Sequence, residues 1–551
     1  MIVNSSESYI MSIPKLLKKS KQKDGIMYIL SLILCFNGVF MSFLSYPNKI
    51  NLYCRLGVIF GWIAICVCWG ICIINKWDYK SGIKAVLKSF FFIGVIEIIY
   101  ALLQLVRLLP SNNHYYSFTG TFDNPAVLSM LLSLCIPIGI YFTITSPSIY
   151  KIKWKVITLC MGIFVVLSAS RTAIIATFCS CIIFYAENTK DFRQQLLRQK
   201  TTIVILLVIL CVCLYYCKHA SADGRLLIWR VSVNMIADKP FLGWGKDGFD
   251  AFYMPYQADY FITHPNSKFQ LLADNIIHPF NEFLLFTIKY GMIGLVLLIC
   301  FIILFFQNIM KYSEEYKDLW ITLSSTIFIW SLFSYPYQIP FIWLVTVYIV
   351  SVNLFTITIR YKYTRILALC TCLTCIFILT CSIKSYKKKF EWIGIQEKAL
   401  NGDSMAMQPQ YERLYKSLKD NAGFLYNYGA ELHYVGLYKK SLLILCECSN
   451  LYNDYNVQML MAHNYQQMGF MDKAIDRYEY AGQMVPNRFL PLYYMMGIYI
   501  EKNDTANACR VADLIVKKPV KIKKSGATQR IINEARSFLQ TTCHKGDSIH
   551  S

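Results

Sequence analysis

The stretch Gly291-Met-Ile-Gly-Leu-Val-Leu-Leu-Ile-Cys-Phe-Ile-Ile-Leu-Phe-Phe306 contains no charged side chain. It belongs to an apolar run near 281–308, which exceeds the roughly 20 residues that a helix needs to cross the hydrocarbon core of a bilayer. Backbone polar groups inside a bilayer must bond to one another, and a helix satisfies them within one segment. The run is therefore predicted to be a membrane-spanning helix.

Similar apolar runs recur along the chain and predict a polytopic bundle of about eleven spans. The expected spans lie near 26–46, 53–75, 84–109, 124–145, 154–169, 171–187, 201–217, 281–308, 319–335, 338–357 and 364–383. Composition agrees, because 56% of the 551 residues are hydrophobic and 16% are charged. The net charge of +22 falls in short segments between the apolar runs, which excludes a nucleic-acid surface.

Most of the 21 cysteines also lie in the apolar runs, where a thiol behaves as a small apolar side chain. They do not combine with histidines at the spacing of metal ligands, so neither a metal site nor a cofactor is expected. The first 25 residues lack the small-residue cleavage site of a signal peptide, so no removable leader is expected.

Basic residues set the orientation of the spans. Lysines before the first span place the N-terminal segment, 1–25, in the cytoplasm. Basic clusters return to that side near 76–84, 151–155, 190–200 and 360–365. The alternation predicts that the loops 110–123 and 218–280 and the C-terminal part are external. Lysines at 384–389 follow the last span on the same external side and favour the opposite orientation.

From about residue 385 to 545 the pattern changes to polar helices with recurring aromatic residues, and two series of positions recur at intervals of 33 and 34. The two series are Gly429, Ala462 and Met496, and Ser441, Ala474 and Ala508. This period is typical of tetratricopeptide repeats, in which paired helices approach closely at small residues. The predicted fold is all-α, with a membrane bundle over 26–384 followed by an α-solenoid, predicted to be periplasmic, over 385–545. An unrelated helical domain is the alternative.

Polar residues at helical spacing mark one face of the span near 84–109. Glu97, Tyr100, Gln104 and Arg107 are three, four and three residues apart, so they share a face. Charged groups inside a span are costly and usually look into the bundle. The face is predicted to be either a buried polar stripe or a surface for substrate.

Two arginines stand beside the predicted external surface. Arg171 lies in Leu167-Ser-Ala-Ser-Arg-Thr172, and Arg225 is four residues before Trp229, so that these two share a helix face. A planar guanidinium with five donors suits a diphosphate at the membrane surface. For Arg171 the alternative is an arginine that extends to the interface. The glycines of 239–249 require a tight backbone but lack the GK[ST] ending of a nucleotide-binding loop.

Four short motifs follow one another along the chain. They are the turn Gly120-Thr-Phe-Asp-Asn-Pro125, the break Ser170-Arg171, the Arg225-to-Trp229 helix with Pro240-Phe-Leu-Gly243, and His278-Pro-Phe-Asn-Glu-Phe283 leading into Gly291-Met-Ile-Gly294. In this order they resemble the O-antigen ligase and polymerase superfamily, and the resemblance covers roughly 26–357. The resemblance implies a metal-independent, multi-pass glycosyltransferase of the bacterial inner membrane. Its donor would be a glycan on an undecaprenyl diphosphate carrier.

The resemblance also implies roles for single residues. Arg171 and Arg225 would hold the diphosphate and stabilise its growing charge, and His278 would orient or deprotonate the acceptor hydroxyl. Further candidates for substrate binding are Trp229, Glu97, Arg107, His264 and Asn281. Many relatives carry a second histidine directly before the asparagine, where this chain has Phe280, so His264 is the alternative base.

The acceptor separates the possible functions. A ligase would transfer the glycan to lipid A core or to a protein hydroxyl, whereas a polymerase of the same fold would transfer it to another lipid-linked glycan. The external repeats add a possible protein partner, because such repeats bind extended peptides. A transporter with a repeat docking domain is the alternative from another class, although the two halves of the chain show no similarity to each other.

Overall fold

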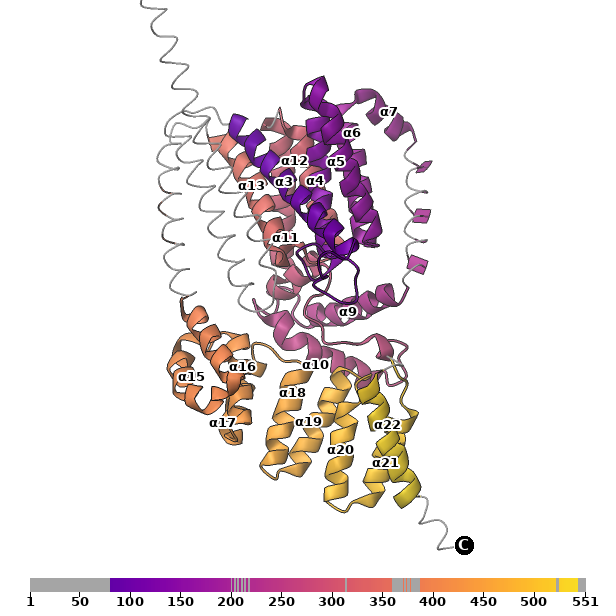
Figure 1. Cartoon of the computed structure of the whole chain (residues 1–551), viewed down its shortest axis with the longest axis vertical. Coiled ribbons are helices and arrows are strands. Elements are labelled where there is room, and N and C mark those ends of the chain that lie inside the picture. The colour runs from indigo at the N-terminus through magenta and orange to yellow at the C-terminus, as the bar shows by residue number, and fades with distance from the viewer. Residues whose placement is uncertain are drawn as a thin grey trace, which may run out of the picture. The chain divides into compact units, whose positions relative to one another are not determined.

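The computed structural model describes residues 80–199, 219–312, 315–358, 387–521 and 525–543, with isolated positions in 201–216 and 370–377. Its elements are helices, and no strand occurs in these ranges (Figure 1). The expected spans near 26–46, 53–75 and 364–383, and most of 201–217, lie outside the described residues. The chain divides into two compact units, Met1–Ile209 with Ile299–Lys387, and Leu210–Leu298 with Lys388–Ser551.

The first unit is a bundle of apolar helices. They are α3 (Lys80–Leu105), α4 (Pro125–Thr145), α5 (Ser148–Leu167), α6 (Arg171–Asn188), α7 (Lys190–Arg198), the end of α11 (Glu282–Tyr312), α12 (Lys317–Phe333), the short 3-10 turn Pro336–Gln338 and α13 (Pro340–Thr358). Helix α4 packs against α3, α5, α6 and α12 and so forms the centre of the bundle. The region 154–187 is two helices, as predicted, because α5 ends at Leu167 and α6 begins at Arg171.

Some of these helices have the length and composition of membrane spans. Within the described part of the chain they are Gly82–Leu105, Pro125–Thr145 and Glu282–Lys311, and Pro340–Asn353 is a shorter apolar helix. The turn 120–125 ends in the first residue of α4. Asn124 caps α4 by accepting a hydrogen bond from the backbone N–H of Ala126, and Pro125 occupies the first turn. The total of about eleven spans stays a prediction.

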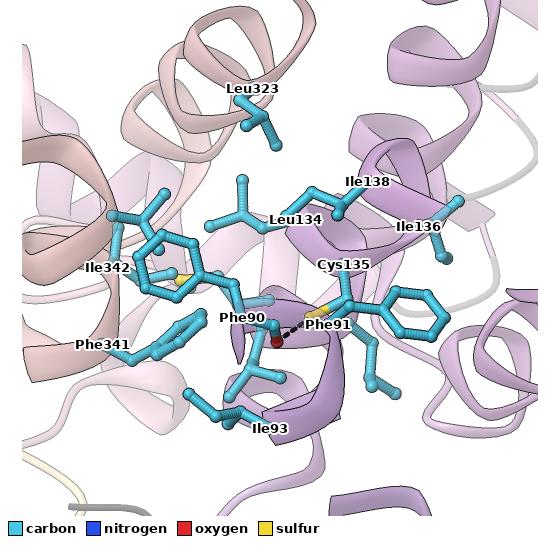
Figure 2. Packing of buried hydrophobic residues seen from close by; sticks show 14 of the residues in the cluster. Phe90, Phe91, Ile93, Leu134, Cys135, Ile136, Ile138, Leu323, Phe341 and Ile342 are labelled. Carbon is cyan, nitrogen blue, oxygen red and sulfur yellow. Dashed lines mark hydrogen bonds between the residues drawn. The ribbon is translucent and has the colours of Figure 1, made fainter. Parts of the chain in front are cut away.

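The core of the first unit is built from aromatic and branched side chains of α3, α4, α12 and α13 (Figure 2). The ring of Phe90 meets those of Phe341 and Tyr348 edge to face, with centroids 5.7 and 5.6 Å apart. Cys135 is fully buried beside them, and its thiol lies 3.4 Å from the carbonyl oxygen of Phe90. This cysteine behaves as the small apolar side chain that the sequence predicts.

The second unit combines two parts of the chain, Leu210–Leu298, which ends inside α11, and the C-terminal helices. Its elements are α9 (His219–Asp238), α10 (Gly248–Thr263), the 3-10 turn Gln270–Leu272, α11 up to Leu298, the π-turn Ala399–Asp403, α15 (Ser404–Leu418), α16 (Ala422–Tyr434), α17 (Tyr438–Ser449), α18 (Tyr455–Gln467), α19 (Met471–Met484), α20 (Leu490–Glu501), α21 (Thr505–Lys517), α22 (Gly526–Phe538) and the π-turn Leu539–Cys543. Helix α10 packs against both α9 and α19.

The C-terminal helices pack as consecutive pairs, α16 with α17, α18 with α19, and α20 with α21 (Figure 1). The small side chains of the repeating series lie where helices meet. Ser441, Ala474 and Ala508 are fully buried, and a Cβ atom on Gly429 would lie 2.8 Å from the side chain of Leu445. The pairs agree with the predicted period, and their assignment to tetratricopeptide repeats stays a prediction.

A disulfide joins Cys509 of α21 to Cys543 in the turn after α22, with their Cα atoms 6.1 Å apart. The sequence analysis treated the cysteines chiefly as small apolar side chains, and this pair was not predicted. Both residues lie in the polar C-terminal part rather than in an apolar run. That context separates them from the cysteines of the apolar runs, but Cys446 and Cys448 share it and are free, so it does not predict the pairing.

Candidate functional site

The polar face of α3 holds the following loop in place. Glu97 is fully buried, and its carboxylate accepts hydrogen bonds from the backbone N–H of Thr121 at 3.0 Å and from the Thr121 hydroxyl at 2.6 Å. The Gln104 side-chain oxygen accepts from the N–H groups of Thr119 and Gly120, both at 2.9 Å. These contacts agree with a buried polar stripe, and a contact of Glu97 with substrate stays a prediction.

Arg107 lies at the end of the same helix and is exposed. Its φ of 62° falls in the left-handed region, which is uncommon for an arginine. The residue lines a cavity of about 500 Å³ together with Leu108, Ser111 and Ser117. The cavity combines one permanent positive charge with hydroxyl groups and apolar walls, so a substrate role for Arg107 is sterically possible and stays a prediction.

Arg171 is the first residue of α6 and is half-buried. The turn before it contains Ala169 with a φ of 51°, and Ser170 precedes the helix in an extended conformation. The N-terminus of a helix is the positive end of its dipole and presents backbone donors. The guanidinium adds a full positive charge at that end, so this place favours an anion.

In the second unit, Arg225 and Trp229 of α9 both reach the loop before α11. The Trp229 indole donates a hydrogen bond to the carbonyl oxygen of Pro279 at 2.9 Å. The Arg225 guanidinium carbon lies 5.2 Å from the centroid of the Phe280 ring, in a cation–π contact. Four-residue spacing on the helix thus brings both side chains to the two residues that directly follow His278.

His278 is half-buried. Its burial, together with the positive charge of Lys289, lowers the pKa of the imidazole to about 4. The imidazole is therefore neutral at pH 7 and has a nitrogen that can accept a proton.

His264 occupies a different environment. It is exposed at the C-terminal end of α10, where its ring stacks on Tyr260 with centroids 4.6 Å apart. Its Nδ1 lies 3.0 Å from the carbonyl oxygen of Tyr260, which is one of the last carbonyls of the helix. These contacts suit a residue that terminates a helix, and the choice between His278 and His264 as the base stays a prediction.

The residues between His278 and α11 have structural tasks. Phe280 has a φ of 55°, which is unusual for an aromatic residue. Asn281 caps α11, because its side-chain oxygen accepts a hydrogen bond from the N–H of Leu284 at 2.9 Å. A contact of Asn281 with substrate stays a prediction.

Helix α11 is broken at Gly291, whose φ and ψ of 68° and −173° are not helical. The segment 240–245 fills the break with its own backbone. Trp244 and Gly245 donate N–H groups to the carbonyls of residues 288 and 289 at 2.8 and 3.0 Å, and the N–H of Met292 donates to the carbonyl of Pro240 at 2.7 Å. The interrupted helix therefore recovers hydrogen bonds that it would otherwise lose.

Two glycines allow this close approach. A Cβ atom on Gly291 would lie 2.0 Å from the carbonyl oxygen of Phe241, and one on Gly243 would lie 2.6 Å from that of Ile288. Sequence reasoning noted the glycines near 243 as a sign of tight backbone but did not predict that they enter a membrane helix. The signal was present, since Gly243 and Gly291 belong to two of the four quoted motifs.

The candidate residues divide between the two units. Arg225, Trp229, His264, His278 and Asn281 belong to the second unit, and Glu97, Arg107 and Arg171 belong to the first. Within the described ranges, no three histidine, cysteine, aspartate or glutamate side chains form a group that could hold a metal ion.

These features define the class of the chain, a helical membrane-embedded protein with a polar site beside a broken apolar helix. Residues 156–299 match the family described as O-antigen ligase, which confirms the family resemblance for this part of the chain. The match covers Arg171, Arg225, His278 and Gly291, whereas the polar face of α3 and the C-terminal helices lie outside it.

Curated relatives agree with this family. A protein of Rickettsia conorii that carries the name polysaccharide ligase is 30% identical over 101 residues, which are 18% of this chain and 23% of that protein. A polysaccharide ligase of Rickettsia felis is 32% identical over 95 residues, or 17% of this chain and 22% of that protein. The chain thus spans less than a quarter of the length of the curated relatives it matches. The crystal structure of MamA matches 28% of this chain and 95% of its own at 14% identity, and its TM-score of 0.21 is too low to support an argument.

Proposed function

We propose that this chain is a membrane glycosyltransferase of the bacterial inner membrane. It moves a glycan from an undecaprenyl diphosphate carrier to an acceptor hydroxyl at the outer face. The observation that supports the proposal is the contact of Arg225 and Trp229 with the two residues that follow His278, inside the part of the chain that matches the O-antigen ligase family. A permanent cation and a neutral imidazole thus belong to neighbouring parts of the same segment.

The two groups match the two charge changes of glycosyl transfer. The bond between the anomeric carbon and the diphosphate breaks, and negative charge grows on the leaving diphosphate, which Arg225 would stabilise by forked hydrogen bonds. The same role for Arg171 stays an expectation from the family resemblance. The new bond forms from the acceptor oxygen, whose proton His278 would take. A pKa near 4 by itself makes the imidazole a weak base. A bound diphosphate would raise that pKa, because a nearby anion favours the imidazolium.

The second unit is proposed to lie outside the cytoplasm. The disulfide between Cys509 and Cys543 supports this location, because such bonds persist in oxidising compartments such as the periplasm. The expected donor is membrane-bound, and the acceptors under consideration are lipid A core, a protein hydroxyl or a second lipid-linked glycan. We favour a ligase acting on lipid A core or protein, and a polymerase of the same fold is the alternative.

The envelope glycans of a deletion strain test the proposal. A ligase predicts that lipid-linked polymer accumulates without reaching its acceptor, whereas a polymerase predicts that single short units are transferred. Restoration by the wild-type chain, and not by Arg225→Ala, would tie the change to the site. Unchanged envelope glycans in the deletion strain would contradict glycan transfer and favour the transporter alternative.

A further inference from the structure

The loop that carries His278 is bonded to the C-terminal helices at several buried points. We define the site loop as residues 264–281, which connect α10 to α11. These contacts lie within the second unit, although they join residues more than 170 positions apart in the sequence.

Asn487 lies in the connection between α19 and α20 and contacts three backbone carbonyls of the site loop. Its side chain is 9% exposed, and its Nδ2 donates to the carbonyl oxygen of Ala273 at 2.5 Å. The same nitrogen lies 3.2 and 3.3 Å from the carbonyl oxygens of Gln270 and Leu271. One amide thus gathers three carbonyls of the turn that leads toward His278.

Gln257 of α10 forms a second buried link and is fully inaccessible to solvent. Its Nε2 donates to the carbonyl oxygen of Met484, at the end of α19, at 2.6 Å and to that of Asp274 at 3.1 Å. The hydroxyl of Tyr253 donates to its Oε1 at 3.0 Å. This side chain ties the site loop to α19 on one side and to α10 on the other.

Asp454 forms a third link at the start of α18. It is 3% exposed, caps that helix by accepting from the N–H of Val457 at 2.9 Å, and also accepts a hydrogen bond from the side chain of Asn275. At the exposed rim, Asp274 pairs with Arg488 at 3.0 Å. The helix cap of the repeat region is therefore shared with the site loop.

Apolar packing reinforces these bonds. Phe269 and Ala273 of the site loop belong to one buried cluster with Met484, Val485 and Phe489 of the C-terminal part. Breaking a hydrogen bond of a buried polar group lowers the folding stability of the protein. The buried bonds and the apolar packing therefore both oppose movement of the site loop.

We propose that the C-terminal helices position the site loop for glycan transfer, with Asn487 as the positioning residue. The bonds from these helices end at Asn275, three residues before His278, and Trp229 holds Pro279 directly after it. His278 is thus fixed from both sides. The inference rests on the proposed function, because it assigns the loop to that reaction, and it gives the C-terminal helices a task besides partner binding.

The first test is hydrogen exchange of the full-length chain purified in detergent. Asn487→Asp keeps the size of the side chain but removes its N–H donors and turns an anionic group toward three carbonyls. Amides of 268–281 are expected to exchange about tenfold faster or more, because their opening is no longer opposed by these bonds. Amides of 422–449 should keep the wild-type rate. Asn487→Ser, which retains one smaller donor, should give an intermediate rate even if the aspartate variant fails to fold.

Asn464→Asp is the matched control. Asn464 is another fully buried asparagine of the repeat region, and its Nδ2 donates to the hydroxyl of Ser441 at 2.8 Å rather than to the site loop. Its substitution should speed exchange within the repeats and leave 268–281 unchanged. Equal loosening of the loop by Asn464→Asp, or an unchanged loop in both Asn487 variants, would overturn the proposal.

The second test separates positioning from general stability. Transfer is measured with lipid extract of the deletion strain as donor, at saturating and at limiting amounts. The Asn487→Ser variant is expected to lower kcat about tenfold while KM changes less than about twofold, because the loop carries the proposed base rather than the donor contacts. Faster loop exchange with undiminished kcat would overturn the positioning role. Failure of the wild-type chain to transfer glycan would contradict the proposed function instead, and the exchange experiment would still decide whether the loop is held.

Discussion

At the scale of single residues, Arg225 can make a ring contact and a forked contact to phosphate, and lysine cannot make the forked one. Its flat guanidinium lies over the Phe280 ring and can also grip two phosphate oxygens at once. We expect Arg225→Ala to lower transfer about 100-fold or more, which is the usual effect of removing one donor to a developing anion. Arg225→Lys should also be badly impaired, and Arg171 is expected to respond in the same way. The measurement is the transfer rate per amount of protein in the membrane.

Arg230→Lys provides the control for this prediction. Arg230 is an exposed arginine of the same helix that lies over another aromatic ring, with its guanidinium carbon 5.4 Å from the centroid of Tyr260. Its substitution should leave transfer close to the wild-type rate. Full activity of Arg225→Lys would show that a point charge suffices and that the forked geometry is not used.

The two histidines should respond differently to substitution. A positioned base typically contributes 10²–10⁴-fold to a rate, so His278→Ala is expected to lose about 100-fold or more in kcat with unchanged donor binding. His264→Ala should retain most of its activity, because this exposed histidine terminates α10. Both rates and donor binding are measured on the purified variants. The reverse result would make His264 the base.

The pH dependence tests the environment of His278. Burial and Lys289 lower the pKa of this histidine from 6.5 to about 4, so the free enzyme holds it unprotonated down to that pH. The acid limb of kcat/KM is therefore expected near pH 4 to 5 and not near 6.5. The same shift makes protonation destabilising, so the contribution of His278 to folding stability should be constant above about pH 6.5 and fall as pH drops toward 4. A wild-type acid limb near 6.5 that His278→Ala removes would contradict the buried environment.

Sequence reasoning found the candidate residues but not what holds them. Arg225, Trp229 and His278 stand in short motifs whose chemistry is legible from residue type. Asn487 and Gln257 carry no such signal, because an asparagine or glutamine in a helical region looks like any polar surface residue. Their importance depends on partners more than 200 positions away, which only the folded chain brings together.

At the scale of elements, the break in α11 can be tested directly by substituting its glycines. Gly291→Ala would place a side chain at positive φ, which costs about 1–2 kcal/mol, and would also force the carbonyl of Phe241 out of the break. We expect the melting temperature of the purified protein to fall by about 5 °C or more, from the usual relation of stability to Tm. Gly243→Ala should also lower the melting temperature, because its new methyl group would meet the carbonyl oxygen of Ile288 at the same break.

Gly497→Ala is the control for these glycine variants. Gly497 lies in the middle of α20, and a Cβ atom there would meet no neighbouring atom within 4 Å. Alanine favours a helix over glycine by about 1 kcal/mol, so this variant should be as stable as the wild type or more stable. A Gly291→Ala protein with an unchanged melting temperature would mean that the break is not needed for stability.

The helices illustrate which elements a sequence can predict. The apolar runs near 84–109 and 124–145 became α3 and α4. The break at Ser170 was visible because the region 154–187 is too long for one bilayer crossing. The break at Gly291 was not predicted, because the residues on both sides of this glycine are apolar and the run looks like one continuous helix. Only the backbone shows that 240–245 enters it.

At the scale of the whole molecule, the division of the chain by hydrophobicity differs from its division into compact units. Hydrophobicity separates the apolar region 26–384 from the polar region 385–545, whereas the compact units place 210–298 with the C-terminal helices. The difference arises because α10 and the site loop are partly apolar segments that bury their side chains against α18 to α20. Periodicity can predict that helices pair with their neighbours in sequence, but it contains no information on pairing across the intervening spans.

The disulfide gives the orientation of the molecule a direct test. Cys509 and Cys543 are joined in the C-terminal part, and structural disulfides are rare in the reducing cytosol. We therefore expect the C-terminal helices outside the cytoplasm, as the alternation of basic residues also predicts. Cys446 is an exposed free thiol on α17 and reports this side. A membrane-impermeant maleimide should label Cys446 in intact spheroplasts, and Cys446→Ser should abolish that part of the signal.

The same sample also decides between the two orientations. Alkylation before and after reduction should reveal two further thiols, and these should disappear in a Cys509→Ser, Cys543→Ser variant. Labelling of Cys446 only after permeabilisation, with both partner cysteines already reduced, would place the helices in the cytoplasm. Because the site loop belongs to the same compact unit as these helices, that result would also move His278 away from the outer face and contradict glycan transfer there.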